Sequence, residues 1–346
     1  MHMADALLSP GVGGVMWVAT ATTLAYSCKK VSKEDLNDLE DGKTIEFKKN
    51  IPLMGVLGAL VFASQMINFT IPGTGSSGHI GGGILLAALL GPEAGLIAIA
   101  SVLVIQCLFF ADGGLLALGC NIINMGFFAC FVGFPLIYKN IVKKNFSPTK
   151  IMIASILAVV VSLQLGSFAV VLETNMSGIS ELPFSTFVML MQPIHLAIGL
   201  VEGVLTGCVL VFIYEARPEL LIGYDGKNKQ GKLSIKSVVC TLLVCTLIIG
   251  GGLSLYASSN PDGLEWSIEK VTGSNELERS TTIGDSLGKV QEKIAFLPDY
   301  GFKSDSENTF GTTVSGIVGS GITLGVAVLV GFVIKGKKNK ESNSNI

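Results

Sequence analysis

Charged residues are scarce in this sequence. They make up 14% of its 346 residues, whereas ordinary soluble domains contain about 25%. Hydrophobic residues account for 49% of the chain, and the mean hydropathy is +0.61. The formal net charge of −2 offers no basic surface, so we expect no nucleic-acid partner. Together these values exclude an ordinary soluble domain and predict a membrane protein with several spans.

Several motifs of catalytic and cofactor-binding proteins are also missing. The chain has no G-x-x-x-x-G-K-[ST] loop to hold ATP phosphates and no H-E-x-x-H zinc motif. Its seven cysteines never form a C-x-x-C pair, so small buried side chains are a better interpretation of them than metal or redox ligands. No lysine or arginine precedes the first apolar run. We therefore expect no cleaved signal peptide and retention of the first residues.

Long apolar segments are abundant, and about 20 apolar residues suffice to cross about 30 Å of hydrocarbon. The 42 glycines fit this interpretation, because glycine is frequent in membrane helices. The expected fold is an all-α polytopic membrane protein with about nine hydrophobic segments, of which 79–91 is the shortest. The segments cover residues 9–27, 51–71, 79–91, 93–111, 115–138, 151–172, 187–214, 237–257 and 312–334.

The distribution of lysine and arginine predicts the orientation of the chain. Most of the 24 basic residues lie in the connections 29–49, 139–150 and 217–236 and in the tail after residue 334. Cytoplasmic loops carry an excess of such residues, so we expect the N-terminus outside and the C-terminus inside. This assignment requires the chain to reverse direction at the short segment 79–91.

A polar stretch over residues 216–236 divides the chain. We interpret residues 1–222 as one membrane module and residues 231–346 as a second module of two helices. Those helices flank a loop, residues 258–311, which we expect outside the cell. The turn signal Pro-Asp-Gly lies near the start of that loop.

Histidine is also rare, with three copies, yet one directly follows the first methionine in the stretch MHMADALLSP. The amine of Met1, the amide nitrogen of His2 and a ring nitrogen of His2 can close two fused chelate rings on one metal ion. Nitrogens in one plane favour Ni(II) or Cu(II). Methionine aminopeptidases remove Met1 only before a small residue, so the amine should stay beside His2. The alternative is that His2 is an incidental polar residue in a frayed tail.

The glycine-rich stretch PGTGSSGH, residues 72–79, lacks the lysine of a phosphate-binding loop. A short, glycine-interrupted segment at membrane depth is typical of a transport site. It places His79 on the same side of the membrane as His2, where its ring could supply a fourth nitrogen. We expect Ser76 and Ser77 to hydrogen-bond around the metal ligands.

Polar residues inside two apolar segments are further candidates. His195 and Glu202 lie on one face of the segment 187–214. Ionisable groups inside membrane helices face the bundle interior or a partner, so these two are assigned to structural hydrogen bonds or to coupling with a partner subunit. Asn121 and Asn124 either hydrogen-bond around the metal ligands or join helices.

Four stretches carry a resemblance to a known family: MHMADALLSP, PGTGSSGHIGGG, ADGGLLALGCNIINMG and HLAIGLVEG. Through them the chain resembles the CbiM/NikM substrate-binding subunits of energy-coupling-factor transporters for cobalt and nickel. PDGLEWSIEKV and LPDYGF, ahead of the last apolar segment, resemble the small companion subunit of CbiN/NikN type. The resemblance implies that Met1, His2 and His79 bind the metal.

The resemblance also implies a mechanism and partners. A subunit of this family would lie in the lipid bilayer of a bacterial plasma membrane and capture its ion on the outer side. It docks on a membrane coupling subunit of CbiQ/NikQ type, which cytoplasmic ATPases of CbiO/NikO type drive, so the chain itself is not an enzyme. Asp112-Gly113-Gly114 and the G-H-I-G pattern resemble nickel-type members. Ni(II) is therefore the expected substrate, and Co(II) is the alternative.

Two other function classes remain open from the sequence. An intramembrane hydrolase would need a serine facing His195 in a water-filled cavity. A stand-alone divalent-metal channel would carry ions without any partner and would be indifferent to the amino terminus. For the loop 258–311 we expect a role in holding the region of Met1 and His79 open for metal loading.

Overall fold

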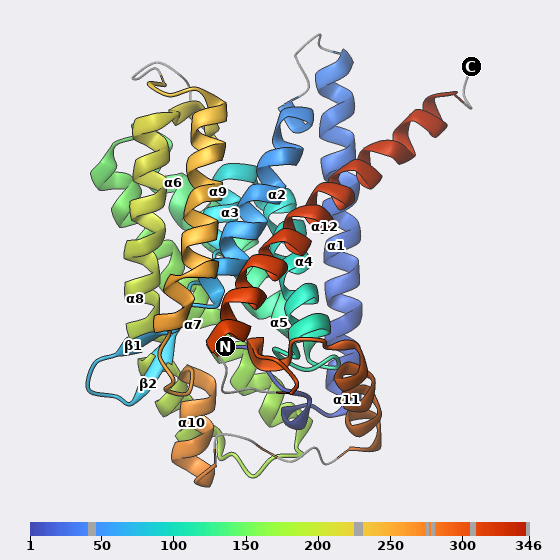
Figure 1. Ribbon diagram of the computed structural model, residues 1–346, viewed down its shortest axis with the longest axis vertical. Coiled ribbons are helices and arrows are strands. Elements are labelled where there is room, and N and C mark those ends of the chain that lie inside the picture. The colour runs from blue at the N-terminus through green and yellow to red at the C-terminus, as the bar shows by residue number, and fades with distance from the viewer. Residues whose placement is uncertain (41–45, 225–230, 275–276, 278–280, 305–308, 344–346) are drawn as a thin grey trace.

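The structure, a computed structural model, is mostly helical. It describes residues 1–40, 46–224, 231–274, 277, 281–304 and 309–343. The expectation of an all-helical chain is wrong in one place, because residues 69–78 form a two-stranded antiparallel hairpin. Figure 1 shows this hairpin beside a bundle of long helices.

The first module begins with a short 3-10 helix, and its longest helices run over about 30 residues each. Its elements are η1 (Asp5–Leu7), α1 (Pro10–Glu40), α2 (Glu46–Gln65), β1 (Phe69–Ile71), β2 (Ser76–Gly78), α3 (Gly83–Leu90), α4 (Pro92–Phe110), α5 (Leu118–Asn121), the π-helix η2 (Ile122–Tyr138), α6 (Lys139–Val142), α7 (Pro148–Ser177), α8 (Phe184–Ala216) and η3 (Pro218–Leu220).

The second module contributes two long helices and a folded loop between them. Its elements are α9 (Ile235–Gly251), η4 (Leu253–Tyr256), α10 (Gly263–Thr272), α11 (Thr282–Ile294), η5 (Pro298–Tyr300) and α12 (Thr309–Asn343). Helices α10 and α11 lie within the loop predicted at 258–311, so much of that loop is ordered.

Local sequence explains where several helices begin and end. Pro92 and Pro148 occupy first helical positions, where the missing N–H of proline is harmless. The Ser147 hydroxyl accepts a hydrogen bond from the Lys150 amide and caps α7. Helix α4 ends at Phe110, and its C-cap Ala111 adopts a left-handed conformation with φ of 57°. That turn redirects the chain into the loop that starts at Asp112.

The hairpin β1–β2 forms because of its glycine-rich turn. Gly73 and Gly75 both have φ of +77°, a conformation that costs glycine little. The turn pairs Phe69 with Gly78 and Ile71 with Ser76. The strand β2 therefore leads directly into His79.

The described residues contain five helices that are long and apolar enough to cross a membrane, and two shorter apolar helices. The five are Pro92–Phe110, Leu118–Val142, Pro148–Ser177, Phe184–Ala216 and Phe310–Ile334, and the shorter ones are Ile51–Gln65 and Ile235–Gly251. The chain is thus a multi-pass membrane protein. The expected number of about nine hydrophobic segments and the expected orientation of the termini are not confirmed. The shortest segment, 79–91, contains α3, whose eight residues span only about 12 Å.

The chain nevertheless reverses direction around α3. His79 contacts the amino terminus of the chain, whereas Glu93, at the start of α4, pairs with Lys30. Lys30 lies about 30 Å along α1 from Pro10 by the rise of a helix. The loop from residue 79 and the helix α3 therefore carry the chain back across most of the bundle before α4 returns.

The two ends of the bundle differ in what they carry. Figure 1 shows the amino terminus, the hairpin, α10 and α11 at one end. The far ends of α1 and α12 and the connection between α8 and α9 lie at the other end. The segments that could form a site with the amino terminus thus lie at one end of the bundle.

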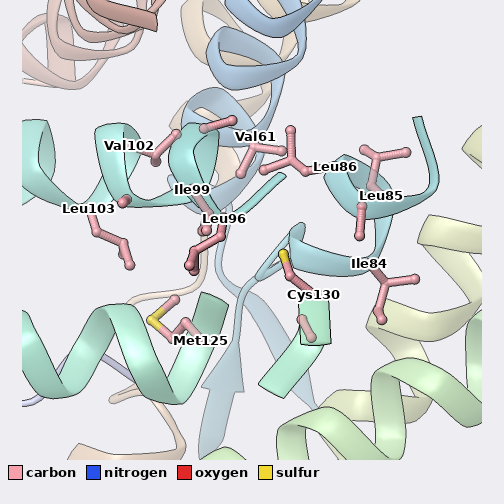
Figure 2. Packing of buried hydrophobic residues seen from close by; sticks show 14 of the residues in the cluster. Val61, Ile84, Leu85, Leu86, Leu96, Ile99, Val102, Leu103, Met125 and Cys130 are labelled. Carbon is pink, nitrogen blue, oxygen red and sulfur yellow. The ribbon is translucent and has the colours of Figure 1, made fainter. Parts of the chain in front are cut away.

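The core lies where α2, α3, α4 and η2 meet (Figure 2). Val61, Leu86, Ile99 and Met125 are members of this buried cluster. Because lipid tails are as apolar as these side chains, close packing rather than exclusion from water stabilises such a core. Gly95 illustrates the closeness, since a Cβ there would lie 3.0 Å from the backbone nitrogen of Ala87.

The two helices of the second module pack through glycines, and this contact is testable. A Cβ at Gly316 of α12 would collide with the carbonyl oxygen of Gly250 in α9. Overpacking of this kind costs about 1–3 kcal/mol. We expect Gly316→Ala to lower the thermal unfolding midpoint of the protein in detergent.

Gly321→Ala on the same helix is the matched control. A Cβ at Gly321 meets no heavy atom of the described residues within 4 Å, and alanine is the better helix former by about 1 kcal/mol. The midpoint should therefore stay unchanged or rise. Equal losses from both substitutions would contradict the close α9–α12 contact.

Candidate functional site

The amino terminus runs into the interior of the protein. Met1 is 5% exposed and Met3 is 0% exposed. The Met3 amide donates to the Asn121 Oδ1 atom at 2.8 Å, and the Asn121 Nδ2 group donates to the Met3 carbonyl at 3.2 Å. The first residues are therefore fixed, which contradicts the alternative of a frayed tail.

A glycine pair after α4 makes room for this terminus. Gly113 has φ of +79°, and a Cβ there would lie 2.8 Å from the Asn121 Nδ2 atom and 3.3 Å from the His2 Cβ atom. The Gly114 amide donates to the Met3 carbonyl at 3.0 Å. The segment Asp112-Gly113-Gly114 thus forms a surface against which the first residues pack.

The three residues predicted to bind metal lie together. The Met1 amine donates to the His79 Nε2 atom at 2.9 Å. The rings of His2 and His79 are stacked, with centroids 5.1 Å apart and an interplanar angle of 20°. A residue at the start of the chain and one that follows β2 therefore present nitrogen atoms to a common point.

Two carboxylates from different modules flank these nitrogens. The Asp262 Oδ2 atom lies 2.6 Å from the Met1 amine, and the Asp112 Oδ1 atom lies 3.2 Å from the His2 Nδ1 atom. Sequence reasoning did not assign either residue a place beside these nitrogens. The signals were present, since Asp112 begins the loop after α4 and Asp262 belongs to a Pro-Asp-Gly turn.

Burial controls the protonation of this region. Burial lowers the pKa of His2 despite the opposing charge of Asp112. Burial, followed by the charge of the terminal amine, lowers the pKa of His79 well below its usual value. Burial alone would raise the pKa of Asp262, but the terminal amine holds it well below the usual range. Both imidazoles are therefore neutral at neutral pH and can offer lone pairs.

The loop of the second module covers the site. The Tyr300 hydroxyl donates to the Asp112 Oδ2 atom at 2.5 Å, and the Gln291 Nε2 group donates to the Gly113 carbonyl at 2.6 Å. The loop therefore packs onto the site and contacts the Met1 amine through Asp262, while its expected role in holding the region open for metal loading stays a prediction.

Ser76 and Ser77 bond to the second module and to their own hairpin. The Ser77 hydroxyl donates to the Asn260 carbonyl at 2.8 Å, and its amide donates to the Pro261 carbonyl at 2.8 Å. The Ser76 amide donates to the Thr74 hydroxyl at 3.0 Å. Their effect on His79 passes through strand β2, so their predicted role around the ligands is indirect.

The two asparagines differ in their contacts. Asn121 holds the main chain of Met3, next to His2. Asn124 donates to the Glu173 carboxylate on α7 at 2.8 Å and lies 3.8 Å from the Met3 sulfur. Asn121 thus acts directly on the terminal segment, while Asn124 also joins two helices. A role of either asparagine around a metal ion stays a prediction.

His195 and Glu202 line a cavity of about 40 Å³ that also touches Met1, His79 and Asp262. The His195 Nδ1 atom lies 2.7 Å from the Met191 carbonyl, and Glu202 accepts from the Gly82 amide at 3.2 Å. His195 is 1% exposed and Glu202 is 5% exposed. Neither side chain reaches the surface, so a role in coupling to a partner, which stays a prediction, would be indirect.

A metal site at this place would need main-chain nitrogen. Among the described residues, no group of three or more His, Cys, Asp or Glu side chains is placed to hold a metal ion. A site made only of the side chains of His2 and His79 would offer two nitrogens. The Met1 amine and the His2 amide raise the number of nitrogen donors to four, all strong donors for a late transition metal.

The hydrolase alternative finds little support in the geometry. The pattern G-x-S-x-G does occur, at residues 284–288, but it lies inside helix α11. In α/β-hydrolases, which carry this pattern, the serine lies on a sharp turn between a strand and a helix. The Ser286 hydroxyl donates instead to the Thr282 carbonyl within the helix.

Comparison with known proteins relates this geometry to transport. The family described as the cobalt uptake substrate-specific transmembrane region matches residues 2–220, and the PDGLE domain matches residues 236–336. A crystal structure of a truncated transition metal transporter is similar at a TM-score of 0.52 and 31% identity, covering 62% of this chain and 98% of that one.

Several relatives have been named for nickel or cobalt. The putative fused nickel transport protein NikMN of Archaeoglobus fulgidus is 32% identical over 94% of this chain and 96% of its own length. The probable fused nickel transport protein LarMN of Lactiplantibacillus plantarum is 30% identical, covering 78% and 79%. The cobalt transport protein CbiM of Geobacter sulfurreducens is 28% identical, covering 80% and 79%. This chain therefore belongs to the family of the cobalt uptake substrate-specific transmembrane region, extended by a PDGLE domain.

Proposed function

We propose that this chain captures Ni(II) as the substrate of a metal importer and holds it with nitrogen atoms of Met1, His2 and His79. The observation that carries the proposal is the 2.9 Å approach of the Met1 amine to the His79 Nε2 atom. Transport of nickel or cobalt by the relatives named above supports the metal class.

The distances suit a square plane of nitrogens. For metal–nitrogen bonds of about 2.0 Å, neighbouring corners of a square lie about 2.8 Å apart. The amine and the His79 Nε2 atom already have this separation. The His2 amide and ring nitrogen follow along the same chain and close the remaining corners. On this proposal the ion replaces the proton that the amine now shares with His79.

Nickel is the favoured ion and cobalt is the second candidate. Four nitrogens in a plane, one of them a deprotonated amide, favour a square-planar ion over Mg(II), Ca(II) or Zn(II). Two relatives named for nickel are fused proteins that match both modules in part or in full. A relative named for cobalt also matches, so selectivity is a question for measurement.

The energy for import is proposed to come from partners. The chain has no ATP-binding loop, so a coupling subunit of CbiQ/NikQ type and ATPases of CbiO/NikO type would supply it. We place the N-terminus and the loop 258–311 outside and the C-terminus inside. The arrangement in Figure 1 supports this placement, because the described residues of the basic connections lie at the end opposite the site.

One added residue before Met1 should abolish tight binding. A preceding glycine moves the free amine away from His2, so the fused chelate rings cannot close, and Met1 is too buried for an extension to fit. We expect the apparent Kd for Ni(II) to rise by at least about a hundredfold, a loss of about 2.7 kcal/mol. Titration of the purified protein with Ni(II), followed by the absorption band of the square-planar complex, measures the Kd.

A tag after Ile346 is the matched control, because helix α12 runs from the end of the bundle that carries the site to the opposite end (Figure 1). Its affinity should equal that of the untagged protein. Equal binding by the native and the glycine-extended proteins would exclude the terminus as a ligand.

The affinity for Ni(II) should rise with pH. The imidazoles are already neutral at neutral pH, because burial lowers their pKa values. The remaining pH dependence comes from protons that leave the amine and the His2 amide. One to two protons released per ion change the apparent Kd about ten- to hundredfold between about pH 6.5 and 7.5. An affinity that does not change over this range would contradict amide ligation.

Uptake should require the partners. If the chain is a capture subunit, proteoliposomes that contain it alone should bind Ni(II) but accumulate none. Vesicles that also contain a coupling subunit and ATPases of the stated types, with the ATPases and ATP on the inner side, should accumulate Ni(II). Accumulation by the chain alone would support the channel alternative instead.

A further inference from the structure

One short stretch of the second module, residues 258–266, follows the hairpin β1–β2 from end to end. The Ser258 amide donates to the Asn68 carbonyl at 2.7 Å, ahead of β1. The Trp266 Nε1 group donates to the Thr74 carbonyl at 2.9 Å, in the turn. Ser77 in β2 forms a parallel bridge with Asp262. The hairpin that leads into His79 is thus held by the second module ahead of β1, in its turn and at Ser77 of β2.

Asp262, at the centre of this stretch, makes two different contacts with its two carboxylate oxygens. The Oδ1 atom accepts from the Leu264 amide at 2.8 Å and from the Glu265 amide at 3.0 Å, and so caps helix α10. The Oδ2 atom lies 2.6 Å from the Met1 amine. The cap fixes the rotamer of the side chain, so the second oxygen is held where the amine needs an acceptor.

We propose that Asp262 is a positioning residue of the metal site, which orients the free amine of Met1 toward His79 before the ion arrives. The inference rests on the proposed function, because it assigns a role in assembling that site. Met1 and His79 belong to the first module, and the second module sets their relative position through Asp262 and the bridge to Ser77.

The need for such a residue follows from the freedom of a chain end. A terminal amine rotates about bonds that no preceding residue restrains, and ordering it costs conformational entropy. His79 accepts one of its N–H groups and Asp262 accepts another. Two acceptors from rigid elements define the direction of the amine, whereas one would leave it free to turn. Preorganisation of this kind raises affinity by removing the ordering cost from the binding step.

The structure offers variants that separate the two contacts. Asparagine and serine are both favourable N-cap residues, so Asp262→Asn and Asp262→Ser should keep helix α10. Asp262→Asn removes the negative charge that faces the amine, and Asp262→Ser is too short to reach it. Glu265→Gln is the matched control, since Glu265 completes the capping box by accepting from the Asp262 amide and does not contact Met1.

The test measures Ni(II) binding to the full chain with its native terminus, by equilibrium titration and stopped-flow absorption. We expect both Asp262 variants to bind Ni(II) more weakly, by up to about tenfold. A loss of this size is in the range of couplings between contacting residues. The loss of affinity should appear as slower association of Ni(II), because the amine must be ordered before the ion binds. Glu265→Gln should bind like the native chain.

Trp266 fluorescence reports whether α10 stays docked, since its indole bonds the Thr74 carbonyl. Weaker binding with native Trp266 emission and an unchanged dissociation rate supports the proposal. Shifted emission with faster dissociation would make Asp262 a merely structural cap and overturn it. Native or tighter binding by both variants would also overturn it. Absence of binding by the native chain would instead refute the proposed function, so the two failures are distinguishable.

Discussion

The candidate site depends on burying a free amino terminus beside an imidazole. A charged group in a poorly solvated place is costly unless it is paired and hydrogen-bonded. Met1 is nearly fully buried, and its amine meets both the His79 ring and the Asp262 carboxylate. The same burial makes the site sensitive to a residue added before Met1, because that residue would have to enter the interior beside His79 and Asp262.

Each other part of the site can be understood as support for that terminus. The glycines after Asp112 leave space for the His2 side chain and for the main chain of Met3. Asn121 holds that main chain through both its amide and its carbonyl. The hairpin β1–β2 brings His79 from the other side. These supports come from η2, from the loop after α4 and from the hairpin, so the terminus is fixed by elements distant in sequence.

Much of the architecture could be predicted from the sequence because membrane spans depend on composition over about 20 residues. The five long apolar helices coincide with expected segments. The short segment was harder, since α3 is flanked by irregular chain and reverses direction without a full crossing. The hairpin was missed because its strands have three residues each, too few for a periodic pattern to emerge.

The residues of the site also differ in whether they could be predicted from the sequence. Met1 and His2 could be recognised because chelation by adjacent residues is a local property. His79 required only the inference that its loop faces the same side. Asp262 could not be placed from sequence, since its approach to Met1 depends on how two modules pack. The contacts of Ser77 with the second module could not be predicted for the same reason.

Packing of the second module on the first then determines whether the site can assemble. The α12 helix approaches α2 and α4 so closely that a Cβ at Gly319 would collide with the Phe62 ring. Next to this contact, Tyr300 stacks on Phe110 with centroids 5.0 Å apart, and its hydroxyl reaches Asp112. The α8–α9 connection lies at the opposite end of the bundle (Figure 1). Fusion therefore contributes by keeping the second module at high effective concentration, while the helix packing aims Asp262 and Tyr300 at the site.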